Sequence, residues 1–183
     1  MVDLYLVRHA QPMIAPGVCY GALDVPADLA ATHQAAQALA RTLPQAARVM
    51  TSPLQRCELL AHVLQGLRPD LAYKNDERLA EMNFGSFEGR RWDSIPQDAY
   101  SAWTARFWLH RFGGVESVAD VMARVASAWD EAVACGKPQV WVTHAGVIRA
   151  ASLLAQGVRR VDQARDWPQA APAFGQCLVL PGG

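Results

Sequence analysis

Gln139-Val-Trp-Val-Thr-His-Ala-Gly-Val147 is the stretch of sequence that best indicates how this chain folds. Its first five residues are rich in β-branched and aromatic side chains, which predict a strand that ends just before His144. Ala145 and Gly146 then lead directly into an apolar pattern with helical spacing that reaches Leu154. A strand, a short polar turn and a helix form the repeating unit of α/β proteins, which bind ligands at their strand ends.

The same alternation continues in both directions along the chain. Strands are predicted over Leu4–Val7, Arg48–Thr51, Leu71–Lys74 and Gln176–Leu180. Helices are predicted over Asp28–Leu43, from an N-cap at Ser52 to about Leu67, over Trp92–Arg111, and from a Ser117–Asp120 capping box to about Ala134. This alternation predicts a three-layer α/β/α sandwich, with a mainly parallel sheet and helices on both faces.

The composition is that of an ordinary globular domain, and we expect residues 1–183 to form one domain because the chain is 51% hydrophobic and 19% charged. Lys and Arg number 17, as do Asp and Glu, so the chain lacks the basic excess of a nucleic-acid-binding protein. No apolar run approaches the roughly 20 residues of a membrane span, and the N-terminal residues do not resemble a signal peptide. We therefore expect a cytoplasmic protein with no nucleic-acid or membrane partner, in which the four scattered cysteines stay reduced.

Unusual polar residues follow three of the predicted strands. Arg8 and His9 follow the first, Ser52 and the nearby Arg56 follow the second, and His144 follows the fourth. If these strands are neighbours, two histidines and two arginines converge over helix N-termini. Such a cluster favours an anion, either a phosphate, which arginine binds bidentately, or a carboxylate.

Four motifs in this chain resemble the signatures of the histidine phosphatase superfamily, also called phosphoglycerate mutase-like, and occur in the same order. They are Leu6-Val-Arg-His-Ala-Gln-Pro12, Ser52-Pro-Leu-Gln-Arg-Cys57, Leu79-Ala-Glu-Met-Asn-Phe-Gly-Ser-Phe-Glu-Gly89 and Val142-Thr-His-Ala-Gly-Val-Ile-Arg149. The resemblance implies the phosphoglycerate mutase-like form of the sandwich. Within the superfamily, residues 16–26 and 84–96 are most similar to the α-ribazole phosphatase branch.

The resemblance also implies a role for each matching residue. His9 corresponds to the nucleophile, Arg8 and Arg56 to phosphate-binding arginines, His144 to the second active-site histidine, and Glu81 to the proton donor. A neutral imidazole can attack phosphorus and form a phosphohistidine, while the arginines and His144 stabilise charge on the phosphoryl oxygens. This chemistry requires no metal and no cofactor, and the chain has no zinc-type His or Cys spacing.

The chain departs from the superfamily pattern in the loop after the nucleophile. Ala10 replaces the usual glycine, and Gln11, Tyr20 and Gly21 are candidates to supply the polar groups that follow it in relatives. Beyond a shifted glycine pair, Glu116 is a candidate on the substrate side of the pocket.

These residues predict a phosphatase for a small-molecule phosphate ester, with α-ribazole 5′-phosphate as one candidate substrate. A phosphoglycerate mutase or a sugar-phosphate or bisphosphate phosphatase on the same fold is an alternative. A phosphoanion-binding protein without turnover is an alternative of another class, and monomer and homodimer are both open. Trp92, Trp103 and Trp108 are either core residues or the wall of a pocket for a flat substrate.

Overall fold

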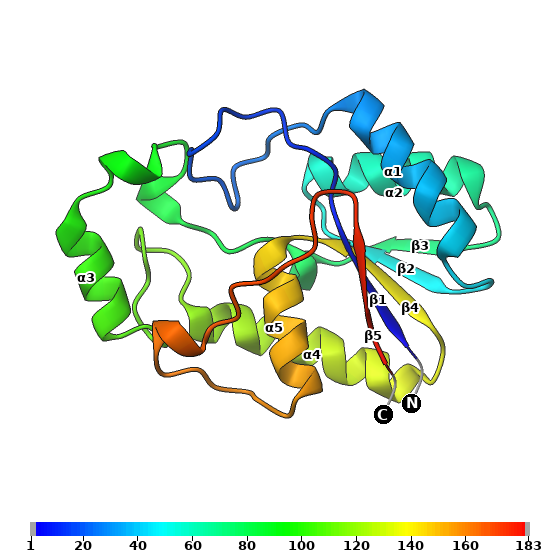
Figure 1. The fold of residues 1–183 in the computed structure, drawn as a ribbon. Coiled ribbons are helices and arrows are strands. Elements are labelled where there is room, and N and C mark those ends of the chain that lie inside the picture. Colours follow the sequence, from blue (N-terminus) through cyan, green and yellow to red (C-terminus); the bar gives the residue numbers. More distant parts are fainter. Residues whose placement is uncertain (1–2, 182–183) are drawn as a thin grey trace.

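The computed structural model describes residues 3–181, which contain a five-stranded sheet in the order β3-β2-β4-β1-β5 (Figure 1). Its strands are β1 (Leu4–Arg8), β2 (Arg48–Thr51), β3 (Ala72–Asn75), β4 (Gln139–Thr143) and β5 (Cys177–Leu180). The first four run parallel to their neighbours, and β5 pairs with β1 in the antiparallel direction. The order places the carboxyl ends of β2, β4 and β1 side by side.

Helices cover both faces of this sheet. Helices α1 (Leu29–Thr42) and α2 (Gln55–Leu67) pack on one face, and α4 (Val118–Cys135) and α5 (Ala145–Ala155) pack on the other (Figure 1). Strand residues alternate between the two layers, so that Val140 and Val142 face α1 and α2 while Trp141 faces α4 and α5. The predicted three-layer sandwich with a mainly parallel sheet is therefore confirmed.

One segment between β3 and α4 packs outside the sheet (Figure 1, green). It contains the 3-10 turns η1 (Glu77–Leu79), η2 (Gly85–Phe87) and η3 (Trp92–Ser94) and the short helix α3 (Gln97–Ala105). Its side chains surround the fully buried Phe112, against which the rings of Phe87, Trp103 and Tyr100 pack. A fourth 3-10 turn, η4 (Ala164–Asp166), follows α5.

Two predicted elements were wrong. The helix predicted over Trp92–Arg111 is interrupted, because Pro96 has no N–H and Ile95 before it is extended, which leaves a helix from Gln97 to Ala105. Ser52 was predicted to cap α2, but that helix begins at Gln55 with Leu54 as its N-cap. The capping box of Ser117 and Asp120 is confirmed at the start of α4. No helix within residues 3–181 is long and apolar enough to cross a membrane.

Candidate active site

The three strand ends that carry the predicted site residues lie next to one another. Register pairs Arg8 with Thr143 across β1 and β4, and the backbone N–H of His9 continues the ladder by donating to the carbonyl of Thr143 over 3.0 Å. The N–H of Ser52 donates to the carbonyl of Val142 over 2.9 Å. The expected convergence at this edge of the sheet is therefore observed.

His9 is held in one orientation by its neighbour. Its ring is almost fully buried, and Nδ1 lies 2.7 Å from the carbonyl oxygen of Ala10. Because a carbonyl can only accept, the ring proton belongs on Nδ1 and the lone pair on Nε2. Burial, with Arg56 and Arg8 adding to it, lowers the pKa of His9 to about 3, so the ring is neutral at ordinary pH.

His144 lies beside His9, with the two ring centroids 5.1 Å apart. Its Nε2 is 2.8 Å from the hydroxyl oxygen of Ser52 and 3.4 Å from the sulfur of Cys57. Burial and then the positive charge of Arg56 hold the pKa of His144 well below its usual value. Its Nδ1 is buried without a hydrogen-bond partner among the described residues.

Arg8 and Arg56 are each held by backbone carbonyls. Arg56 is fully buried, and its guanidinium donates to the carbonyls of Gly21 over 2.6 Å and Leu23 over 2.9 Å. Arg8 donates to the carbonyl of Pro172 over 3.0 Å, and the ring of Phe174 covers its guanidinium with 3.9 Å from Cζ to the ring centroid. The two arginines supply the positive charge at this end of the sheet, within a chain of zero net charge.

The loop that holds Arg56 depends on one carboxylate. The side chain of Glu88 accepts hydrogen bonds from the backbone N–H groups of Gly21, Ala22, Leu23 and Phe84. A Cβ on Gly21 would lie 1.8 Å from the carbonyl oxygen of Met82, so the loop approaches this close because residue 21 has no side chain. Tyr20, which precedes Gly21 in this loop, lies under the Arg56 guanidinium, with 5.3 Å from Cζ to the ring centroid.

Glu81 lies at the N-terminus of α5. Its carboxylate accepts from the N–H of Gly146 over 3.0 Å and from the N–H of Met82 over 3.0 Å. A Cβ on Gly146 would lie 2.2 Å from Oε1 of Glu81, so only glycine permits this contact. The carboxylate also acts electrostatically on Arg8 and Tyr20, which places it at the border of the cationic cluster.

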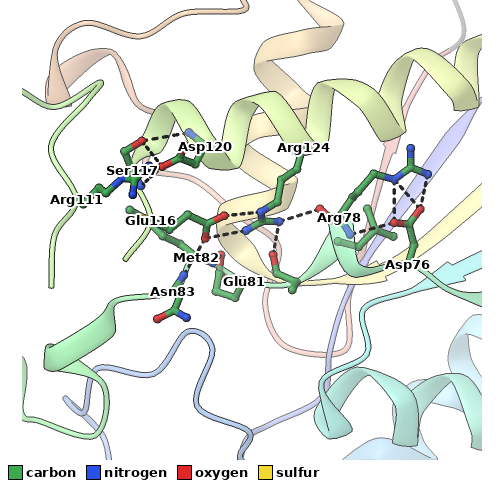
Figure 2. Close-up of polar contacts among 12 residues, drawn as sticks. Asp76, Arg78, Glu81, Met82, Asn83, Arg111, Glu116, Ser117, Asp120 and Arg124 are labelled. Carbon is green, nitrogen blue, oxygen red and sulfur yellow. Dashed lines mark hydrogen bonds and ion pairs between the residues drawn. The ribbon is translucent and has the colours of Figure 1, made fainter. Parts of the chain in front are cut away.

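Glu116 was expected on the substrate side of the pocket, and in the structure its carboxylate is hydrogen-bonded to other protein groups (Figure 2). It forms an ion pair with Arg124 of α4, 2.7 Å from Nε to Oε1, and accepts the N–H of Asn83 over 2.9 Å. Arg124 also donates to the carbonyl of Ala80 over 2.6 Å. Glu116 and Arg124 therefore fix the Glu81 loop onto α4, because the guanidinium binds the backbone before Glu81 and the Glu116 carboxylate binds the backbone after it.

Gln11 lies apart from this network. Its side chain is exposed, and it lines a hollow together with Gln34 of α1 and Phe174. Two site residues were missed by sequence reasoning, Ser52 as the partner of His144 and Phe174 as the cover of Arg8. No local pattern marks Phe174, which is far from Arg8 along the chain. The serine, by contrast, was inside a recognised motif.

The fold and this site define a phosphoglycerate mutase-like α/β protein, and comparison with known sequences is consistent with that class. The model of the histidine phosphatase superfamily (branch 1) matches residues 4–173, so this chain belongs to that superfamily. No curated protein sequence matches the chain significantly.

Solved structures of two proteins give the most informative likenesses. A mycobacterial glucosyl-3-phosphoglycerate phosphatase in complex with VO3 is 25% identical with a TM-score of 0.80, over 98% of this chain and 92% of that one. The same phosphatase with inorganic phosphate is 26% identical with a TM-score of 0.72, over 86% and 80% of the two chains. TTHB049 from Thermus thermophilus is 25% identical with a TM-score of 0.72, over 97% and 92%. These neighbours do not specifically support the α-ribazole phosphatase branch.

Proposed function

We propose that this protein is a phosphatase that hydrolyses phosphate monoesters of small metabolites through a phosphohistidine at His9. The observation that carries the proposal is the orientation of His9, whose Nδ1 faces the Ala10 carbonyl at 2.7 Å and leaves Nε2 as the nucleophilic atom. Arg8, Arg56 and His144 border that ring, and they supply the positive charge and donors that a phosphoryl group requires.

The first step transfers the phosphoryl group to the protein. Nε2 of His9 attacks phosphorus in line, the P–N bond forms, and the bond from phosphorus to the ester oxygen breaks. Glu81 in its protonated form gives its proton to the departing alkoxide. Arg8 and Arg56 stabilise charge on the phosphoryl oxygens, and the buried Nδ1 of His144, which has no protein partner among the described residues, donates to one of them.

The second step regenerates the protein. The ionised Glu81 takes a proton from water, the resulting nucleophile attacks phosphorus, and the P–N bond breaks to release orthophosphate. The backbone N–H groups of Met82 and Gly146 keep the carboxylate in place for both transfers. His9 returns to its neutral form, which the buried environment favours.

A phosphatase is favoured over a mutase on this fold. A mutase must keep water from the phosphohistidine, whereas here the segment between η2 and α4 contributes one nine-residue helix, α3. Sugar phosphates are candidate substrates because two of the compared structures are of a glucosyl-3-phosphoglycerate phosphatase. α-Ribazole 5′-phosphate is a candidate because of the sequence motifs at residues 16–26 and 84–96.

The test is hydrolysis of p-nitrophenyl phosphate between about pH 5 and 8 in the presence of EDTA, followed by a panel of natural esters. We expect turnover that resists EDTA, disappears in His9→Ala and persists in His62→Ala, which alters an exposed histidine of α2. When the reaction with an ester labelled at phosphorus is quenched rapidly without acid, the labelled phosphoryl group should be found on His9. Loss of turnover in EDTA, or full activity of His9→Ala, contradicts the mechanism. Phosphate binding without turnover of any ester supports the binding protein.

A further inference from the structure

A second cavity adjoins the proposed catalytic site beyond Glu81. It has a volume of about 260 Å³ and lies where the segment around α3 meets α4 and α5. Its lining includes Arg149 and five aromatic rings, those of Phe84, Trp92, Trp103, Phe107 and Trp167. The expectation that tryptophans line a pocket is met by Trp92 and Trp103, whereas Trp108 lies in a separate hollow with Arg160.

Glu81 and Gly146 connect this cavity to the proposed reaction centre. Both line the cavity, and the N–H of Gly146 binds the Glu81 carboxylate. Gly146 lies two residues after His144 at the start of α5, so this part of the cavity wall is next to the cationic cluster. The carboxyl group that we propose to protonate the departing alkoxide thus forms part of the cavity wall. The alcohol part of an ester would leave on this side.

The aromatic rings hold one another in position. Phe84 meets Trp92 edge-on at 5.4 Å between centroids, Trp103 lies 5.7 Å from Phe107, and Phe107 lies 6.2 Å from Trp167. Such mutual packing makes the cavity preformed rather than dependent on a ligand. Its 260 Å³ is below the roughly 300–1,000 Å³ of pockets for whole drug-sized ligands, while an apolar cavity of about 150 Å³ holds benzene. It therefore suits a single one- or two-ring group.

Two buried nitrogens of residues that line the cavity lack hydrogen-bond partners within residues 3–181. Six buried side-chain nitrogen or oxygen atoms within residues 3–181 have no hydrogen-bond partner, and three of them belong to Arg8, Arg56 and His144. Two of the remaining three are Nε1 of Trp103 and Nε of Arg149, both cavity residues. Because buried donors almost always find an acceptor, a group that enters and contacts these nitrogens is favoured when it carries one.

We propose that this cavity binds the alcohol part of the substrate, and that the preferred substrates are phosphate monoesters whose alcohol carries a planar aromatic group with a hydrogen-bond acceptor. This inference rests on the proposed phosphatase function and narrows its substrate class. A polyhydroxylated alcohol finds too few polar partners among five aromatic rings, and the cost of its lost hydrogen bonds to water disfavours it.

Three esters of primary alcohols test the proposal without large differences in leaving-group basicity. They are ethyl phosphate, 2-(2-naphthyl)ethyl phosphate and 2-(quinolin-6-yl)ethyl phosphate, of which only the last carries a ring acceptor. We expect kcat/KM for the naphthyl ester to exceed that for ethyl phosphate by about 10- to 100-fold, since the ring is buried. The quinoline ester should exceed the naphthyl ester by a further factor of about 5 to 10.

Variants show whether the cavity is responsible. Trp103→Phe keeps a ring but removes the indole N–H, and Arg149→Met removes the guanidinium, so each should reduce the ratio of quinoline to naphthyl kcat/KM toward one. Trp108→Phe, outside the cavity, should leave both ratios unchanged. Equal kcat/KM for all three esters in the wild-type protein overturns the inference while leaving the phosphatase intact.

A binding measurement keeps the inference testable if hydrolysis itself fails. Calorimetric titration of His9→Asn with the three esters should give the same order of affinity, and it requires no turnover. If no ester is hydrolysed by the wild type but the order of affinity holds, the proposed function is wrong and the cavity assignment stands. Equal affinities for the three esters contradict the cavity assignment.

Discussion

The hydroxyl oxygen of Ser52 lies 2.8 Å from Nε2 of His144, and both residues are buried. A hydroxyl that donates to Nε2 leaves the ring proton on Nδ1, the nitrogen that has no protein partner among the described residues. Ser52 also accepts the N–H of Leu54 over 3.3 Å, which leaves its hydroxyl proton available to donate to the histidine. With Ser52 as the donor, His144 carries its ring proton on Nδ1, the atom that we propose binds the phosphoryl group.

Ser52→Ala should lower kcat/KM on phosphate esters by about 10-fold, because it removes a buried hydrogen bond that orients His144. Steady-state kinetics with p-nitrophenyl phosphate measures the effect, and Ser52→Thr should recover part of the loss. Ser94→Ala is the matched control, since Ser94 also makes a local bond, to the Arg91 carbonyl, but is exposed. Wild-type kinetics in Ser52→Ala would show that the tautomer is set elsewhere.

The low pKa of His9 should make folding stability dependent on pH. The folded-state pKa of about 3 lies below the roughly 6.5 of an unfolded histidine, so the unfolded chain binds more protons between these values. The stabilisation is complete above about pH 6.5 and decreases as the pH falls, by about 2 kcal/mol at pH 5 for this one group.

Urea unfolding of the wild type and His9→Asn at pH 7 and pH 5 measures this effect. The free energy of unfolding should decrease less in His9→Asn, and the remaining decrease includes His144, whose pKa is shifted in the same direction. An identical decrease in the two proteins would contradict a neutral, buried His9.

Glu88→Gln should destabilise the protein by about 2–3 kcal/mol, because its carboxylate accepts four backbone N–H groups and an amide presents one oxygen and a repelling NH2. The loop whose carbonyls hold Arg56 should loosen, so KM for phosphate esters should rise as well. Thermal unfolding and steady-state kinetics report the two effects. Glu77→Gln, an exposed residue of the same segment, should change neither.

Gly146→Ala should lower kcat by about 100-fold or more, the usual contribution of a general acid, because the added methyl would meet Oε1 of Glu81 at 2.2 Å. Binding of inorganic vanadate should change far less, since the cationic cluster is not touched. The control is Gly66→Ala in α2, where a Cβ meets nothing within 4 Å. If vanadate binding is lost together with kcat, the substitution has disturbed the whole site rather than Glu81.

Sequence reasoning located the strand-end residues because each belongs to a short contiguous motif. Arg8 ends β1, and His9 and His144 directly follow β1 and β4. The parallel order of β2, β4 and β1 then brings them together without further information. The orientation of Ser52 was not predictable in this way, because a serine before a proline is equally suited to cap a helix.

The segment between β3 and α4 shows where the periodic pattern fails. Aromatic residues at helical spacing predicted one long helix. In the structure, Trp92 and Trp103 pack against Phe112, and both line the cavity together with Phe107. These three residues therefore do not form one face of a helix. The ion pair of Glu116 was not predicted for a related reason, since its partner Arg124 is eight residues away on α4 and is identified by tertiary contact alone.

The groups that we assign to reaction and those that we assign to recognition come mostly from different segments of the chain, and they meet at Glu81. Arg8 lies at the end of β1, and His9 and His144 directly follow β1 and β4. Four of the five aromatic rings that line the cavity come instead from residues 84–107, which pack outside the sheet. Substitutions in that segment can therefore change the substrate preference of related proteins while the residues that react with phosphorus stay the same. In protein engineering, replacing residues 84–107 with the equivalent segment of a relative should transfer that relative's preference for the alcohol part of the ester.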